Sequence, residues 1–347
     1  MLSRLFCNSV CLTLCVQVKS HSKGSSNKPD AENIALAKAA DVTIIFCGAS
    51  TGESADRQSL SLDADCDAFI SAVAKVSKKV AVLVMTPGAF LTPWREEVST
   101  VATMFLGGQE TGAAWADIVF GDVSPAGRLP IELPATEADT IEPNPAPSFA
   151  YTGEKPVFLS HLYRKIIILP RQARHKHRES THKQTVRIEG LMTSYRNTTA
   201  RRAYPFGHGL TYSAFEWGDV SSVKCPTASP AWEVCLGMTV TNTGQQAASM
   251  PAGGRALSEA ATDTPQLYLK FPPEARQPRS ILKGFAKTAL LQPSESATVT
   301  FSLSARDLSY YAEQSKSWVK ADVGKIVYEV SRNSVDVVRN GTLGALL

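Results

Sequence analysis

Two short, uninterrupted apolar runs most restrict the folds open to this chain. Residues 42–47 (VTIIFC) and 80–85 (VAVLVM) each have the length of a strand, and neither alternates with polar residues. Strands of this kind are buried on both faces, as in a parallel sheet that helices cover on both sides. Residues 66–78, between the two runs, carry apolar side chains at helical spacing. The pattern predicts a strand–helix–strand unit.

The same alternation extends on both sides of this unit. Residues 31–40 and 109–120 have helical composition or spacing, and residues 101–105 (VATMF) form a third apolar run. We therefore predict a partial α/β domain with a mostly parallel sheet over residues 31–150. Ligands of such sheets bind at the carboxyl ends of the strands, and residues 48–57 lie at that edge.

The last third of the chain has a different pattern. Short alternating segments separated by turn residues predict an all-β sandwich over residues 212–347, with residues 188–211 as the end of the α/β domain and a connector. The predicted strands are 232–241, 266–270, 280–287, 297–303 and 325–331.

The positive charge of the chain is local. Of 36 basic and 32 acidic residues, twelve Lys or Arg and only two Glu fall between Lys155 and Arg202, so the remainder is slightly acidic. Without a glycine-rich loop, zinc-ligand spacing or regular aromatics, this block does not predict nucleic-acid binding. Residues 151–187 lack an amphipathic period. They are either a mobile surface insertion or foreign sequence such as translated intron, and we favour the second.

The start of the chain resembles a weak secretory signal. Arg4 precedes a short apolar stretch that Asn8 and Thr13 interrupt, and we assign residues 1–30 to a leader. No apolar run reaches the ~18 residues that a membrane span needs. We expect a secreted or extracellular protein, with a cytoplasmic one as the alternative. Export would make the sequons at Asn197 and Asn340 usable.

The seven cysteines include no CxxC pair and no cluster with histidine. Cys225 and Cys235 are the pair that could form a disulfide, provided that the protein is exported. Cys47 and Cys66 fall in predicted core elements, where we expect buried free thiols.

The loop after the first apolar run, GASTGESADR (residues 48–57), is the best candidate for chemistry. Its glycines are compatible with dinucleotide binding, but their spacing is GxxxG and not GxGxxG. Glu53 and Asp56 would also repel a pyrophosphate, so we reject this interpretation. A carboxyl group on such a loop can instead protonate a leaving-group oxygen if its pKa is raised. Glu53 is the best-placed carboxyl group for that role.

Several blocks of the sequence resemble glycoside hydrolase family 3 of the β-glucosidase type, in the family's order. They cover roughly residues 31–150 and 188–338 and include TNTG, QLYLKFP, LKGFAK and LSYY in the part that is similar to the family's fibronectin III-like domain. The long blocks are ADVTIIFCGASTGESADRQSLSL, VLVMTPGAFLTPW, MFLGGQETGAAWADIVFGDVSPAGRLPIELP and YPFGHGLTYSAFEW. Within them, we expect Glu110 and His208 to be structural residues.

The resemblance implies a retaining β-glycosidase in which Glu53 is the general acid/base and Asp56 and Arg57 support its loop. It places the nucleophile, an Asp, on a (β/α)8 barrel N-terminal to this region. No Ser-Asp or Thr-Asp pair here is followed by an aromatic residue. We therefore expect a C-terminal part without the nucleophile, whose partner would be a barrel domain.

The implied substrate is a β-linked oligosaccharide or glycoside, with glucoside, xyloside and N-acetyl-glucosaminide left open. The family resemblance implies no cofactor and no metal. The rival hypothesis is a non-catalytic carbohydrate-binding or interaction module built from the same two domains.

Overall fold

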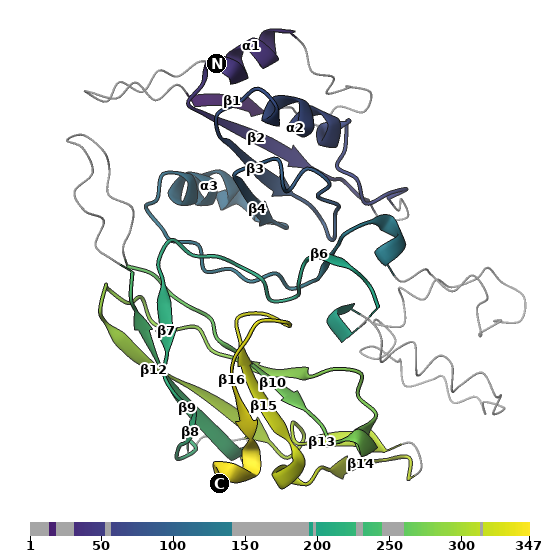
Figure 1. Ribbon diagram of the computed structural model, residues 1–347, viewed down its shortest axis with the longest axis vertical. Coiled ribbons are helices and arrows are strands. Elements are labelled where there is room, and N and C mark those ends of the chain that lie inside the picture. The colour runs from purple at the N-terminus through teal and green to yellow at the C-terminus, as the bar shows by residue number, and fades with distance from the viewer. Residues whose placement is uncertain are drawn as a thin grey trace, which may run out of the picture.

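The fold consists of an α/β domain and a β-sandwich that lie at opposite ends of the long axis of the molecule (Figure 1). None of the described helices combines the length and apolarity that a membrane span requires. The computed structural model describes residues 14–18, 31–52, 57–140, 194–196, 199–226, 232–244, 260–312 and 315–347. The predicted insertion, residues 151–187, lies outside these ranges.

A four-stranded parallel sheet forms the centre of the α/β domain, with its strands in sequence order. The strands are β1 (Leu14–Val18), β2 (Val42–Gly48), β3 (Val80–Met85) and β4 (Thr100–Met104). The predicted fold class is thus confirmed. Residues 14–18 were predicted as part of a leader, but the structure pairs them with β2, Leu14 opposite Val42. A strand and the apolar part of a leader can both be short apolar runs, which explains the difference.

Helices cover both faces of this sheet, as the unbroken apolar strands require. They are α1 (Ala31–Ala39), α2 (Cys66–Ala74) and α3 (Thr111–Val119), the last preceded by a 3-10 turn, Gly108–Glu110. On one face, Ile45 and Val82 pack against α1, α2 and the buried ring of Trp94. On the other face, Ile44 and Leu83 pack against Trp115 of α3.

The C-terminal domain is a sandwich of two antiparallel sheets, ordered β12-β9-β7 and β11-β10-β15-β16, with β8 paired to β9 and a separate β13–β14 hairpin. Alternating side chains such as Leu236, Leu267, Phe301 and Val330 meet in one core between the sheets. The strands are β7 (Phe215–Trp217), β8 (Ser221–Ser222), β9 (Trp232–Asn242), β10 (Gln266–Lys270), β11 (Ile281–Phe285), β12 (Ser296–Ser304), β13 (Ser309–Ala312), β14 (Ser317–Lys320), β15 (Val327–Ser331) and β16 (Val337–Thr342).

The connector between the domains is tied to both of them. Strand β6 (Arg202–Tyr204) pairs with β5 (Leu133–Pro134) of the α/β domain. Farther along, the Leu129 amide donates to the His208 carbonyl oxygen at 2.8 Å. On the sandwich side, the buried Gln266 side chain donates to the Gly207 carbonyl oxygen at 2.9 Å. The connector is therefore a rigid joint.

A buried carboxylate, Asp263, completes this joint. The side chains of Asp263 and Arg128 are only 8% and 13% exposed, and Arg128 Nη2 donates to Asp263 Oδ1 at 2.7 Å. Asp263 also accepts hydrogen bonds from Trp217 Nε1 at 2.7 Å and from the Thr264 amide at 2.8 Å. Since Arg128 belongs to the α/β domain and Trp217 to the sandwich core, the cluster links the two domains through one ion pair.

Two disulfides connect described residues. Cys225 is joined to Cys235 of β9, with 5.3 Å between their Cα atoms. Cys47 is joined to Cys66, with 6.3 Å between their Cα atoms. The expectation of two free thiols at Cys47 and Cys66 is therefore wrong, because the return of the chain into α2 brings the start of that helix beside the end of β2.

Candidate active site

The carboxyl ends of β2, β3 and β4 form the edge where the sequence places the candidate chemistry. Adjacent loops are held together there by main-chain hydrogen bonds, from Ala49 to the Met85 carbonyl oxygen at 3.0 Å and from Thr86 to that of Met104 at 3.3 Å. A cavity of 170 Å³ opens at this edge, and Leu106 on its rim is 84% exposed. It is lined by Ala49, Ser50, Thr51, Met85, Thr86, Pro87, Phe105 and Leu106.

The loop after β2 leaves the sheet beside this cavity and returns into α2. Its two ends meet, because the Asp63 amide donates to the Gly48 carbonyl oxygen at 2.9 Å. The amide and hydroxyl groups of Ser50 both donate to Asp63 Oδ2, at 2.8 and 2.7 Å. The sequence pattern did not indicate Asp63 as the acceptor that holds Ser50. Its spacing from the glycine-rich turn is the one signal that could have indicated it.

Arg57 connects this loop to the loop after β3. Its guanidinium donates to the carbonyl oxygens of Ala89, at 2.7 Å, and Ser61, at 3.1 Å. Glu53 and Asp56 lie outside the described residues, so the predicted acid/base and its predicted neighbour have no described position. Gly52 and Arg57 are the described residues that flank them in the sequence.

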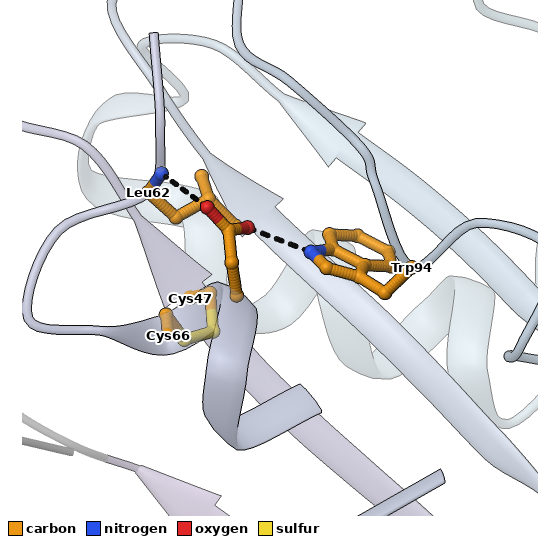
Figure 2. Close-up of a disulfide and its surroundings, with 5 residues drawn as sticks. Cys47, Leu62, Cys66 and Trp94 are labelled. Atoms are coloured by element: carbon orange, nitrogen blue, oxygen red, sulfur yellow. Dashed lines mark hydrogen bonds between the residues drawn. A yellow bond between two sulfur atoms is a disulfide. The ribbon is translucent and has the colours of Figure 1, made fainter. Parts of the chain in front are cut away.

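A second carboxylate, Asp67, is fixed where the loop enters α2. Asp67 Oδ1 accepts from Trp94 Nε1 at 2.7 Å, and Oδ2 accepts from the Leu62 amide at 3.2 Å; in Figure 2 the two dashed lines from these donors end on this carboxylate. Burial raises the pKa of Asp67, and the hydrogen bonds from Trp94 and Leu62 partly offset that rise. A raised pKa is typical of catalytic acids. Because both oxygens already accept from the protein's own groups, Asp67 is better suited to bracing the loop than to proton transfer.

The other described residues singled out by the sequence do not line the cavity. His208 packs against Tyr204 in the connector, with ring centroids 5.3 Å apart. Burial lowers the pKa of His208, and the positive charge of Arg128 lowers it further. Glu110 is exposed at the end of the turn before α3. Asn340 is exposed on β16, whereas Asn197 falls outside the described residues.

Within the ranges that the structure describes, no three His, Cys, Asp or Glu side chains are grouped so that they could hold a metal ion.

Comparison with known families assigns both domains. Residues 9–212 match the model of the glycosyl hydrolase family 3 C-terminal domain, and residues 263–334 match that of the fibronectin type III-like domain. The first match begins within the predicted leader, in agreement with the place of β1 in the sheet.

Similar proteins carry β-glucosidase names. The thermostable beta-glucosidase B of Acetivibrio thermocellus is 30% identical over 309 residues, which cover 87% of this chain and 35% of that protein. The probable beta-glucosidase D of Aspergillus flavus is 31% identical over 338 residues, covering 94% of this chain and 39% of that protein. The chain thus spans little more than a third of the length of these relatives.

Solved structures show the same fold. A Bifidobacterium adolescentis GH3 beta-glucosidase superimposes with a TM-score of 0.66 at 27% identity, over 90% of this chain and 40% of that one. Beta-glucosidase 3B of Thermotoga neapolitana, in complex with glucose, gives a TM-score of 0.66 at 26% identity, over 91% of this chain and 39% of that one. With the family model covering more than half of its residues, the chain belongs to glycoside hydrolase family 3.

Proposed function

We propose that this chain supplies the general acid/base of a retaining β-glucosidase-type hydrolase, with Glu53 in that role. The observation that carries the proposal is the place of the loop between β2 and α2. It leaves the carboxyl edge of a parallel sheet beside a cavity, and Asp63 and Arg57 brace its described ends. An acid must be held on a rigid frame to meet a leaving group in the correct geometry.

The second carboxyl group of the reaction belongs, on this proposal, to a barrel domain. Retaining glycosidases place two carboxyl groups ~5–5.5 Å apart, one as nucleophile and one as acid/base. The barrel Asp attacks the anomeric carbon while Glu53 protonates the departing oxygen. Glu53 then takes a proton from water, which attacks the glycosyl-enzyme and releases the sugar with retained configuration.

The proposed substrate is a β-linked oligosaccharide or glycoside, since the named relatives are mostly β-glucosidases. No cofactor enters the proposed reaction. We further propose that the protein works in an oxidising compartment outside the cytoplasm, because its described residues contain two disulfides, which form and persist in such compartments.

The acid role is tested by joining a family 3 barrel ahead of β1 and replacing Glu53 with Ala. Turnover of alkyl β-glucosides should fall by ~10²–10⁴-fold, the usual contribution of a general acid. Activated aryl glycosides should lose far less in the glycosylation step, because their leaving groups depart without a proton. Azide should partly restore turnover by replacing the base-activated water.

The matched control is Glu110→Ala, which removes an exposed carboxylate from the same domain and should leave turnover unchanged. Equal losses of Glu53→Ala on both substrate types, without azide rescue, would move the acid role to another residue.

The chain by itself should not hydrolyse aryl β-glucosides, because the proposed nucleophile lies on the barrel. Hydrolysis by the purified chain that disappears in Glu53→Gln would show instead that both carboxyl groups lie within it. Binding of β-glucosides without hydrolysis, even after fusion to the barrel, would favour the rival carbohydrate-binding function.

A further inference from the structure

The Cys47–Cys66 disulfide lies where the catalytic frame of the proposed enzyme has to be rigid. Cys47 is next to the last residue of β2 and Cys66 is the first residue of α2, with a sequence separation of 19 (Figure 2). The bond therefore joins the two ends of the segment that leaves and re-enters the sheet edge, whose described parts are residues 48–52 and 57–65. Cys66 is 3% exposed, and Cys47 is only partly buried.

The other contacts that hold the described ends of this segment are weaker than a covalent bond. The hydrogen bonds from Ser50 to Asp63 are exposed, so water competes for both partners. Arg57 is likewise held through hydrogen bonds to carbonyl oxygens. Leu62, which precedes α2, donates its amide to Asp67 and has its side chain buried in the core of the domain. Among the described contacts of this segment the disulfide is the covalent one, and its loss leaves the hydrogen bonds and the buried Leu62 side chain to resist opening.

We propose that the Cys47–Cys66 disulfide is a redox-sensitive positioning clamp for residues 48–52 and 57–65, and that a dithiol reductant releases it. Its effect on turnover rests on the proposed function, whereas its effect on local opening does not. With a sequence separation of 19, the closed loop restricts the open ensemble by on the order of 100-fold, so releasing it should raise the population of locally opened molecules.

The chemistry of release is a thiol–disulfide exchange. A thiolate of the dithiol attacks Sγ of Cys47, the more accessible sulfur, and the bond to Cys66 Sγ breaks. Cys66 leaves as a thiolate and takes up a proton. The second thiol of the reductant then displaces Cys47, which also ends as a thiol, and the reductant becomes a cyclic disulfide. The protein gains two electrons and two protons.

Loosening of this frame should affect proton donation more than substrate binding. A displacement of ~1 Å at a catalytic group can cost ~10²-fold in rate. Because only poor leaving groups need protonation, the loss should be large for alkyl glucosides and small for activated aryl glycosides, and should appear in kcat with little change in KM. A general loss of folded protein would lower the turnover of both types of substrate equally.

The test on the chain itself uses the Cys225→Ser/Cys235→Ser variant. This variant lacks the sandwich disulfide, so reduction acts on the Cys47–Cys66 disulfide. Amide hydrogen exchange is measured before and after reduction with dithiothreitol and alkylation. The amides of Leu62 and Asp63 should exchange at least tenfold faster after reduction. Those of Ala261 and Leu291, which bond each other in the sandwich, should not change.

The matched variant is Cys47→Ser/Cys66→Ser, which should show the fast exchange with or without dithiothreitol. Unchanged amide exchange rates at Leu62 and Asp63 on reduction would contradict the proposed clamp. Loss of protection throughout β2 and β3 would also overturn it, since the disulfide would then hold the whole domain and not one segment.

The effect on turnover is measured in the barrel fusion, oxidised and reduced. A tenfold or larger fall in kcat on alkyl glucosides, with little change on aryl glucosides, supports the positioning role, and equal activity in both states overturns it. A fusion that is inactive even when oxidised contradicts the proposed function, while the exchange experiment still decides the clamp.

Discussion

The ion pair between Arg128 and Asp263 makes a quantitative prediction about the joint between the domains. Replacing Asp263 with Asn keeps the size of the side chain but removes the charge that Arg128 faces. If the Asn oxygen takes the place of Oδ1, it still accepts from Arg128 Nη2 and the Thr264 amide, and Trp217 Nε1 meets an NH2 group in place of Oδ2. The guanidinium is left without its carboxylate at a site only 13% exposed.

The magnitude follows from this burial. Breaking a buried ion pair by removing one partner typically costs ~3–5 kcal/mol. Asn still accepts two of the three hydrogen bonds, so we expect a loss near the lower limit, about 3 kcal/mol. At roughly 2–4 °C per kcal/mol for domains of 150–250 residues, the melting temperature should fall by about 6–12 °C.

The free energy of unfolding is measured by urea titration, monitored through tryptophan fluorescence and circular dichroism, and the melting temperature by heating under the same probes. The matched control is Asp41→Asn, which breaks an ion pair of similar length, Lys78 Nζ to Asp41 Oδ1 at 2.9 Å, whose side chains are 64% and 42% exposed. An exposed pair of this kind contributes at most about 1 kcal/mol. If Asp263→Asn costs no more than Asp41→Asn, the assignment of the joint to a buried ion pair is wrong.

A double-variant cycle separates the pair from its surroundings. Arg128→Met together with Asp263→Asn should cost less than the sum of the two single changes, by about 1–3 kcal/mol, because the second change no longer leaves a buried charge alone. Strict additivity would show that the two side chains act independently.

Three further predictions concern other parts of the molecule. Trp94→Phe removes a hydrogen bond to a carboxylate and should cost about 1.5–3 kcal/mol in urea unfolding at pH 7; the loss should shrink as the pH falls through the raised pKa of Asp67, because protonation removes the charge that the bond stabilises. Gly207→Ala places a methyl group against the buried Gln266 side chain at a φ of 79°, and should lower the unfolding free energy by at least ~1–2 kcal/mol; an unchanged melting temperature would contradict this. Asn340 is exposed, so export from a eukaryotic host should give a glycosidase-sensitive mass shift that Asn340→Gln reduces by one glycan; an unchanged shift in that variant would contradict this.

The strands buried on both faces were the most predictable part of the fold. Residues 80–85 were predicted as a strand with the bounds that β3 has, because their apolar run has one explanation at that length. Strand β1 was missed because a leader and an edge strand of a sheet can share the same apolar composition. The hairpin of β13 and β14 was missed because its half-exposed residues, such as Tyr311 and Trp318, show little contrast between faces.

Tertiary partners were the least predictable part of the site. The family resemblance implied that Arg57 supports its loop, but the carbonyl oxygens that Arg57 contacts include that of Ala89, on a different loop. The pairing of Cys47 with Cys66 depends on how α2 returns to the sheet, which no local pattern contains. Asp263 lies 135 residues from Arg128 in sequence, so the joint between the domains could not be derived from either segment alone.

The pairing of β5 with β6 has a consequence for engineering. The Ala135 amide donates to the Arg201 carbonyl oxygen at 3.1 Å, so the chain leaves and re-enters the α/β domain at one point on its surface. The entropy of closing a loop between fixed ends grows only with the logarithm of its length, by ~0.6 kcal/mol for each doubling. A fluorescent protein or an affinity module inserted between residues 141 and 193 would therefore start and finish at adjacent points, without forcing the two folded domains apart.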